Sequence, residues 1–396
     1  MTAIFPIHAS DVKSFKSCRR RWDWSSGLRQ NLEPDITPIF FLVGRGIHQA
    51  MNLYYEKGIP PLATYEEFLI RSNIGDEDLF PGEKDKRKDA IRVGREIARN
   101  YPKWINSPDQ PDEKWRVVAT EMPFSLPLNS PKTGRPSRRI YLEGRFDQII
   151  EDVETGLLWL REFKTAARDP NPSWLDFDDQ LTTYCYAAQQ IIGRPIAGIQ
   201  YRFLMKKTPE KPPRLKSGDK LSRAINSTLK TTYTLYEEAI DELALDMLSW
   251  RHTNLNAPET PITDLAQGGV LSLSEPLLLE FKEIRQALRV EYYDIREELL
   301  QRGWSEYFKE IEVRKTQTEI MNAAAQLWEV GLEMTKPSVY VYPSPDWMKC
   351  NFCGFSTPCK VMNAGGNYES IIANMYRKRV PEPEVDTSYI IGSLEE

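Results

Sequence analysis

The chain has 396 residues, of which 41% are hydrophobic and 28% are charged, as in ordinary soluble globular proteins. This length allows roughly two to three domains, or one domain with large insertions. The net charge of −5 argues against a protein that is held on nucleic acid by bulk charge alone. The sequence has no apolar run near the ~20 residues that cross a bilayer, and it does not open on a basic stretch followed by an apolar core. We therefore expect a cytoplasmic protein without a membrane partner.

Histidine and cysteine are the residue types whose numbers restrict the chemistry most. The chain has three histidines, which disfavours any catalytic or metal site built from a histidine cluster. It has five cysteines, and an odd number in a cytosolic chain favours metal or redox use over a disulfide framework.

The first part of the chain predicts helices and then strands. Apolar residues at helical spacing predict helices over 10–26, over 38–57 and from the charged loop 75–89 to about residue 104. Alternating patterns predict strands over 115–128, 139–150 and 157–165. The last two strands are joined by the turn-rich residues 151–156, as in a hairpin.

The second part of the chain predicts mainly helices. A helix over 176–193 and a strand over 198–206 come first. A loop rich in proline and lysine follows at 207–217, and long helices are predicted over 228–254, 274–302 and 306–332. Residues 333–365 are predicted to be irregular and carry three cysteines.

An acidic–lysine constellation lies on the predicted hairpin. Glu162 and Lys164 share one face of a strand because side chains alternate, and the hairpin brings Asp147 beside them. Two carboxylates and the backbone carbonyl of Phe163 make a hard oxygen site suited to Mg²⁺ or Mn²⁺. The alternative for Glu162 and Lys164 alone is a surface hairpin with an ion pair.

The surroundings of this constellation resemble the PD-(D/E)XK nuclease superfamily, and in particular its RecB-like branch. Gly-x-x-Asp is followed 15 residues later by Glu-x-Lys. A Gln-xxx-Tyr motif on the next helix, a histidine on an upstream helix and an acidic residue on the preceding strand occur in the order that the family has them. The matching positions are His48, Glu121, Gly144, Asp147, Glu162, Lys164, Gln180 and Tyr184.

The resemblance implies a role for each of these positions. His48, Asp147 and Glu162 would ligate the metal, and Glu121 would either ligate it or order the site from outside the ligand set. Lys164 would be the catalytic lysine, which orients water or stabilises developing negative charge. The residues that would position DNA or the lysine are Gln180 and Tyr184. For His48 the alternative is an ordinary hydrogen-bonded helix histidine.

Four of the cysteines form a second constellation. Cys350, Cys353 and Cys359 have x2 and x5 spacings near one end of the chain, and Cys18 lies far upstream. This arrangement resembles iron–sulfur nucleases of the AddB type and the CRISPR-associated adaptation nucleases, which implies a [4Fe–4S] cluster. Zinc is the alternative, although structural zinc sites usually use two close pairs of ligands. Cys185 stands outside the pattern, and we expect a buried small hydrophobe.

Basic and aromatic residues are candidates for DNA contact. Arginines beside aromatic rings can track a nucleic-acid backbone and stack on bases. The alternatives are solvated basic faces and aromatic packing around a cluster. The candidates are Arg19, Arg20, Arg21, Trp22, Arg45, Lys206 and Lys207.

Together these patterns predict an α/β protein with a restriction-endonuclease-like PD-(D/E)XK core, a mixed sheet flanked by helices. The predicted segments are an N-terminal helix with one cluster cysteine (1–37), the nuclease core (38–206), a helical insertion (207–335), the cluster segment (336–380) and an acidic, disordered tail (381–396).

The resemblance implies a metal-dependent exonuclease that acts on single-stranded DNA or free DNA ends in recombination, repair or phage-type processing, with recombination or helicase proteins as partners. The alternatives are a structure-specific or RNA-directed endonuclease and a catalytically idle nucleic-acid-binding protein. The intact set of aspartate, glutamate and lysine argues against the idle protein.

Overall fold

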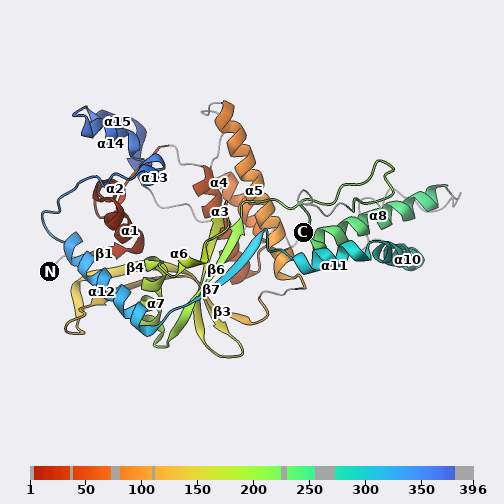
Figure 1. The fold of residues 1–396 in the computed structure, drawn as a ribbon, viewed down its shortest axis with the longest axis horizontal. Coiled ribbons are helices and arrows are strands. Elements are labelled where there is room, and N and C mark those ends of the chain that lie inside the picture. The colour runs from red at the N-terminus through yellow and green to blue at the C-terminus, as the bar shows by residue number, and fades with distance from the viewer. Residues whose placement is uncertain are drawn as a thin grey trace. The chain divides into compact units, whose positions relative to one another are not determined.

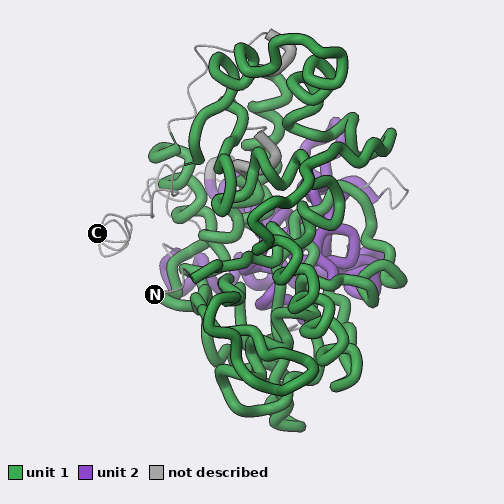
Figure 2. Tube along the Cα trace, turned by 90° about the vertical axis from the view of Figure 1, so that its left-hand side faces the viewer, with its two compact units in different colours: residues 1–99, 112–204, 310–396 green, residues 100–111, 205–309 purple. Residues whose placement is uncertain are grey.

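The computed structural model describes residues 4–35, 39–72, 81–108, 112–223, 230–254 and 273–379. The chain divides into two compact units, of which the first comprises residues 1–99, 112–204 and 310–396 and the second residues 100–111 and 205–309 (Figure 2). Residues 310–335 lie in the first unit, although the sequence pattern places them in the helical insertion. The tail predicted to be disordered, 381–396, lies outside the described residues.

A mixed sheet forms the centre of the first unit (Figure 1). Its order is β1-β4-β5-β6-β7, and β3 pairs with the other edge of β4. β1 runs parallel to β4, whereas β3 and β5 run antiparallel to it. The strands are β1 (Phe5–His8), β3 (Trp115–Asn129), β4 (Pro136–Asp152), β5 (Leu158–Ala166), β6 (Ile196–Met205) and β7 (Phe308–Arg314).

Helices flank this sheet, which confirms the predicted architecture of a mixed sheet between helices. Figure 1 shows α3 and α4 on the opposite side of the sheet from α7 and α12. The helices of the first unit and of the link to the second are α1 (Ala9–Ser17), α3 (Ile39–Lys57), α4 (Pro61–Arg71), α5 (Pro81–Ile105), α6 (Pro172–Leu175), α7 (Asp179–Ile192) and α12 (Gln317–Met334). Among the described helices, none is long and apolar enough to cross a lipid bilayer.

The structure corrects several predicted elements. The helix expected from residue 306 begins only at Gln317, because β7 pairs with β6 and buries Phe308 and Val313. The helix expected over 10–26 is interrupted at Cys18, whose extended backbone separates α1 from α2 (Arg19–Ser25). The cysteine-bearing segment expected to be irregular contains two short helices, α13 (Trp347–Asn351) and α14 (Ser356–Asn363). β1, α4 and the short strand β2 (Leu32–Pro34) were not predicted.

The two ends of the described chain pack together. β2 pairs antiparallel with β8 (Tyr376–Lys378), which follows α15 (Tyr368–Met375). A small apolar cluster lies beside this pairing and combines residues from both ends. Its buried members are Trp24, Leu32 and Phe355, and Cys353, Cys359, Met362, Tyr368, Ile372 and Tyr376 pack against them.

Two buried arginines connect central strands of the sheet. Arg161 on β5 and Arg202 on β6 both pair with Asp112, at 3.1 and 2.5 Å, and Arg202 Nε also pairs with Glu310 at 2.7 Å. Burial opposes ionisation of Asp112, but the two guanidinium groups hold its pKa below the ordinary value. This charge network holds β5 in place at Arg161, the residue immediately before the predicted site residue Glu162.

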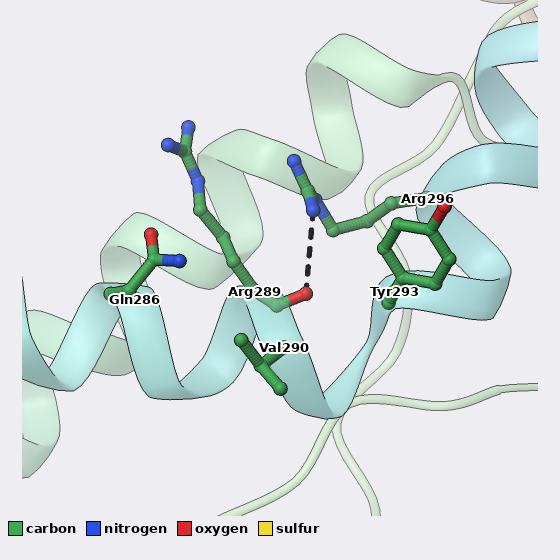
Figure 3. A pocket seen from close by; sticks show the side chains of 5 residues that line it. All are labelled: Gln286, Arg289, Val290, Tyr293 and Arg296. Atoms are coloured by element: carbon green, nitrogen blue, oxygen red, sulfur yellow. Dashed lines mark hydrogen bonds between the residues drawn. The ribbon is translucent and has the colours of Figure 1, made fainter.

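The second unit is a helical cluster of α8 (Tyr233–Asn254), α10 (Glu275–Glu291) and α11 (Tyr293–Arg302). Its core includes Tyr236, Ile240, Leu243, Phe281 and Leu288. A depression of about 250 Å³ on this unit is lined by Gln286, Arg289, Val290, Tyr293 and Arg296 (Figure 3). Arg289 and Arg296 both bind Glu237 of α8, so the charged groups beside the depression tie the helices together.

Candidate metal centre

The predicted site lies where β4 changes its neighbouring strand. Along one edge of β4, β1 pairs with residues 140–143 and β5 pairs with residues 148–151. The intervening segment, residues 144–147, therefore lies between the ends of two strands. At this point the backbone N–H of Phe163 on β5 donates a hydrogen bond to Asp147 Oδ2, with an N···O distance of 3.0 Å.

Gly144 opens this segment, and the packing explains why the motif has glycine there. A Cβ at this position would lie 2.7 Å from Phe124 Cζ and 2.8 Å from the hydroxyl oxygen of Tyr184. Both distances are shorter than van der Waals contact, so any larger residue would displace one of these rings. The glycine thus lets Tyr184 approach the strand that carries Asp147.

Three side chains from three elements meet at Asp147. One ligand atom each of His48 (α3), Glu121 (β3) and Asp147 (β4) lies within 4.8 Å of the other two. His48 Nδ1 is 3.4 Å from Asp147 Oδ2, and Glu121 Oε2 is 3.3 Å from Nη1 of Arg145. Within the described ranges, no other group of three or more histidine, cysteine or acidic side chains is as close.

Glu121 has an unusual backbone for a strand residue. Its φ of +44° lies in the left-handed region, which costs a residue with a Cβ about 1–2 kcal/mol. Strain of this kind is common at functional sites, where the surrounding structure holds it in place. No sequence pattern signals this conformation.

Glu162 and Lys164 lie on the same face of β5, as the alternation predicts. Lys164 Nζ is 2.9 Å from Glu162 Oε1, and both side chains are only partly exposed. Of the predicted ligands, Glu121 therefore lies in the close group with His48 and Asp147, whereas Glu162 binds the lysine. Burial opposes the charge of Lys164, but Glu162 and, to a smaller extent, Asp178 raise its pKa above the ordinary value. Asp178 also caps α7 by accepting the N–H groups of Gln180 and Leu181.

The pKa values show how strongly these charges interact. Burial alone would lower the pKa of His48, but the charge of Asp147, with smaller effects of Glu162 and Glu121, raises it to about 9. Burial, and then the charge of Asp147, raises the pKa of Glu162 to about 7. Burial and Asp147 also raise the pKa of Glu121. The carboxylates of Glu121, Asp147 and Glu162 thus repel one another, and a bound cation would reduce this repulsion.

Tyr184 and Gln180 lie at the same site, on α7. The Tyr184 hydroxyl has the Gln180 side chain and the Arg145 backbone as hydrogen-bond partners. Burial, and then the charges of Glu162 and Asp147, raises the pKa of Tyr184 to about 12. Tyr184 therefore stays protonated at neutral pH, and its hydroxyl remains a hydrogen-bond donor.

The residues present fit a divalent cation. Carboxylate oxygens of Glu121 and Asp147 are donors for Mg²⁺ and Mn²⁺, and His48 adds an imidazole nitrogen once it has lost its proton. The distances already bring the three donors together.

Comparison with protein families agrees with this geometry. Residues 7–360 match the family model of the PD-(D/E)XK nuclease superfamily, which is most of the chain. The chain belongs to the PD-(D/E)XK nuclease superfamily. No curated protein gives a significant match. Membership of this superfamily indicates a metal-dependent nuclease whose substrate is nucleic acid.

Cys18, Cys350, Cys353 and Cys359 of this PD-(D/E)XK nuclease lie in the two end segments of the described chain, which pack together. Three sulfurs accept N–H groups: Cys18 from Ser344 at 3.5 Å, Cys350 from Asp346 at 3.4 Å and Cys359 from Arg20 at 3.4 Å. The pKa of Cys353 is raised mainly by burial and also by the charges of Cys18 and Cys350. Among the described residues, the cysteines form no group as close as that of His48, Glu121 and Asp147. Cys185 is fully buried, as expected of a small hydrophobe, and burial raises its pKa to about 12.

The candidate DNA contacts of the PD-(D/E)XK nuclease differ in exposure. Trp22 is 0% exposed and packs edge-on against Phe15, so its ring does not face solvent and we no longer consider it a DNA contact. Arg20 is buried and binds Cys359 and Asn363, and Arg19 pairs with Glu333. Arg21 is exposed and Arg45 is half-buried, and the remaining candidates, Lys206 and Lys207, belong to the second unit.

Sequence reasoning missed Arg145 and Asp178 as members of the nuclease site. Arg145 lies inside the Gly-x-x-Asp motif and binds Glu121. Asp178 precedes the helix of the Gln-xxx-Tyr motif, and an aspartate in that position is a common helix cap. Arg145 lies inside one recognised motif and Asp178 lies two residues before another, so the sequence could have identified both residues.

Proposed function

We propose that the protein is a DNA exonuclease that uses Mg²⁺ or Mn²⁺ held by His48, Glu121 and Asp147. The observation that carries this proposal is the convergence of these three donors in a chain of the PD-(D/E)XK superfamily. Glu162 and the carbonyl of Phe163 complete the predicted ligand set. Action at DNA ends, in recombination, repair or phage-type processing, rests on the resemblance of the motifs to the RecB-like branch.

The chain's own groups have separate tasks in this hydrolysis. A bound divalent ion would lower the pKa of a water and neutralise charge on the scissile phosphate. Lys164, held by Glu162 at 2.9 Å, places a positive charge where negative charge develops on the phosphate oxygens. Tyr184 and Gln180 hold the segment of β4 that carries Asp147, and Arg145 holds Glu121.

We also propose that Cys18, Cys350, Cys353 and Cys359 hold a [4Fe–4S] cluster. Structural zinc sites usually use two close pairs of ligands, whereas this chain has one trio at x2 and x5 spacings and a single distant cysteine. N–H groups directed at three of the sulfurs are also suited to thiolates around such a cluster.

Linear and circular single-stranded DNA distinguish the proposed exonuclease from its rivals. With Mn²⁺ we expect end-labelled linear strands to be degraded and circular strands of the same sequence to survive, because the circle offers no end. The measurement is the size distribution of both substrates on a denaturing gel over time. Rapid cleavage of circles would favour the endonuclease, and survival of both substrates would favour the catalytically idle protein.

A further inference from the structure

An exposed aromatic pair lies on the connection between the two catalytic elements. β5 carries Glu162 and Lys164, and α7 carries Gln180 and Tyr184. Residues 167–178 join them and include α6. Trp174 is 71% exposed and Phe177 is 75% exposed, although both rings are large and apolar. Phe177 immediately precedes Asp178, which caps α7 and whose charge acts on Lys164, so this end of the connection lies next to the site.

Hydrogen bonds hold this connection in a defined shape. Asn171 caps α6 by accepting the N–H of Ser173 at 3.1 Å, and the N–H groups of Trp174 and Phe177 donate to backbone carbonyls three residues earlier, at 3.1 and 3.2 Å. The buried Lys315 donates to the carbonyl of Asp176 at 2.6 Å. The two rings are therefore presented on a fixed turn, which lowers the entropy lost when they bind a ligand.

The chemistry around the rings favours nucleic-acid bases over a protein partner. A protein-docking face is usually a continuous apolar patch, whereas acidic residues separate and follow these rings in the sequence Trp174-Leu-Asp-Phe177-Asp. The acidic groups disfavour phosphate contact at this point, but bases are uncharged and stack on any aromatic face. Bases in a duplex are already stacked, so these rings select unpaired DNA.

We propose that Trp174 and Phe177 form a platform on which unpaired bases beside the scissile phosphate stack. This inference rests on the proposed function, because it takes DNA as the substrate. It adds the two residues that make the enzyme prefer single strands or frayed ends. Neither residue is among the proposed metal ligands, so the platform positions the substrate and takes no part in the bond-breaking step.

The test is DNA binding in chelator, where hydrolysis does not interfere. Fluorescence anisotropy measures the affinity for a thymidine oligonucleotide and for an abasic strand of equal length, which keeps the phosphates and lacks the bases. We expect the double variant Trp174→Ala/Phe177→Ala to bind the thymidine strand at least ~10-fold more weakly and the abasic strand unchanged. Trp174→Phe should retain most of the affinity, because a phenylalanine ring still stacks.

A matched control is Trp250→Ala, which removes a tryptophan that is 68% exposed on α8. It should bind both strands as the wild type does. An equal loss on both strands, or no loss in the double variant, would overturn the platform, as would a wild type that binds the two strands equally or neither. A wild type that shows the expected binding but hydrolyses no DNA with Mn²⁺ would refute the proposed nuclease activity and leave the platform standing.

Discussion

Replacing Lys164 by alanine is expected to lower the rate of metal-dependent DNA hydrolysis at least ~100-fold, as the loss of one preorganised electrostatic stabiliser does. In the structure its ammonium group binds Glu162, next to the close group of His48, Glu121 and Asp147. The measurement is the rate of nucleotide release from end-labelled DNA at saturating Mn²⁺.

The fold should survive this change, because Lys164 is partly exposed and its ion pair with Glu162 joins two residues of the same strand. The matched control is Lys114→Ala, which removes a lysine paired with Glu312 at 2.6 Å on the same unit but outside the site. This control should keep the wild-type rate. Full activity of Lys164→Ala, with the same melting temperature as the wild type, would remove this lysine from the mechanism.

If Cys18 is one of the four proposed cluster ligands, replacing it by serine is expected to abolish the brown colour of anaerobically purified protein. The cluster would close a loop that contains every strand of the central sheet except β1, and in the chain-entropy model such a crosslink stabilises the fold by on the order of 5 kcal/mol. We therefore expect Cys18→Ser to lose iron and sulfide and to melt at a lower temperature. The measurements are visible absorbance, metal content and thermal melting.

Cys185→Ala is the matched control for the cluster, since it removes a buried cysteine that lies outside the pattern. It should keep its iron, although its small cavity lowers stability slightly. Loss of colour in Cys185→Ala together with a coloured Cys18→Ser would show that the fourth ligand is misassigned. A colourless wild type with one zinc per chain would refute the cluster while leaving the crosslink between the two ends.

The hairpin and its site were predictable because local rules decide them. Alternating residues and the turn at 151–156 indicate strands β4 and β5, and alternation alone places Glu162 and Lys164 on one face. His48 could be assigned to a helix from its apolar periodicity. Its contact with Asp147 at 3.4 Å joins two separate elements, and only the family resemblance suggested it.

Other features depend on contacts between distant parts of the chain. β7 contains Lys309, Glu310, Glu312 and Arg314, residues that are compatible with a helix, and its pairing with β6 overrides that preference. Likewise β2 and β8 have three residues each and form because the two ends of the chain meet. The positive φ of Glu121 has no signal in the sequence, since a glutamate ordinarily avoids it.

The most direct test of the central claim, a metal-dependent nuclease site at Asp147, compares three reactions on end-labelled linear single-stranded DNA. They are the wild type with Mn²⁺, the wild type with chelator, and Asp147→Asn with Mn²⁺ at the same protein concentration. Asparagine keeps the shape of the side chain but removes the negative charge that the cation needs. Label should be released only in the first reaction, and equal release in either of the other two would contradict the assignment.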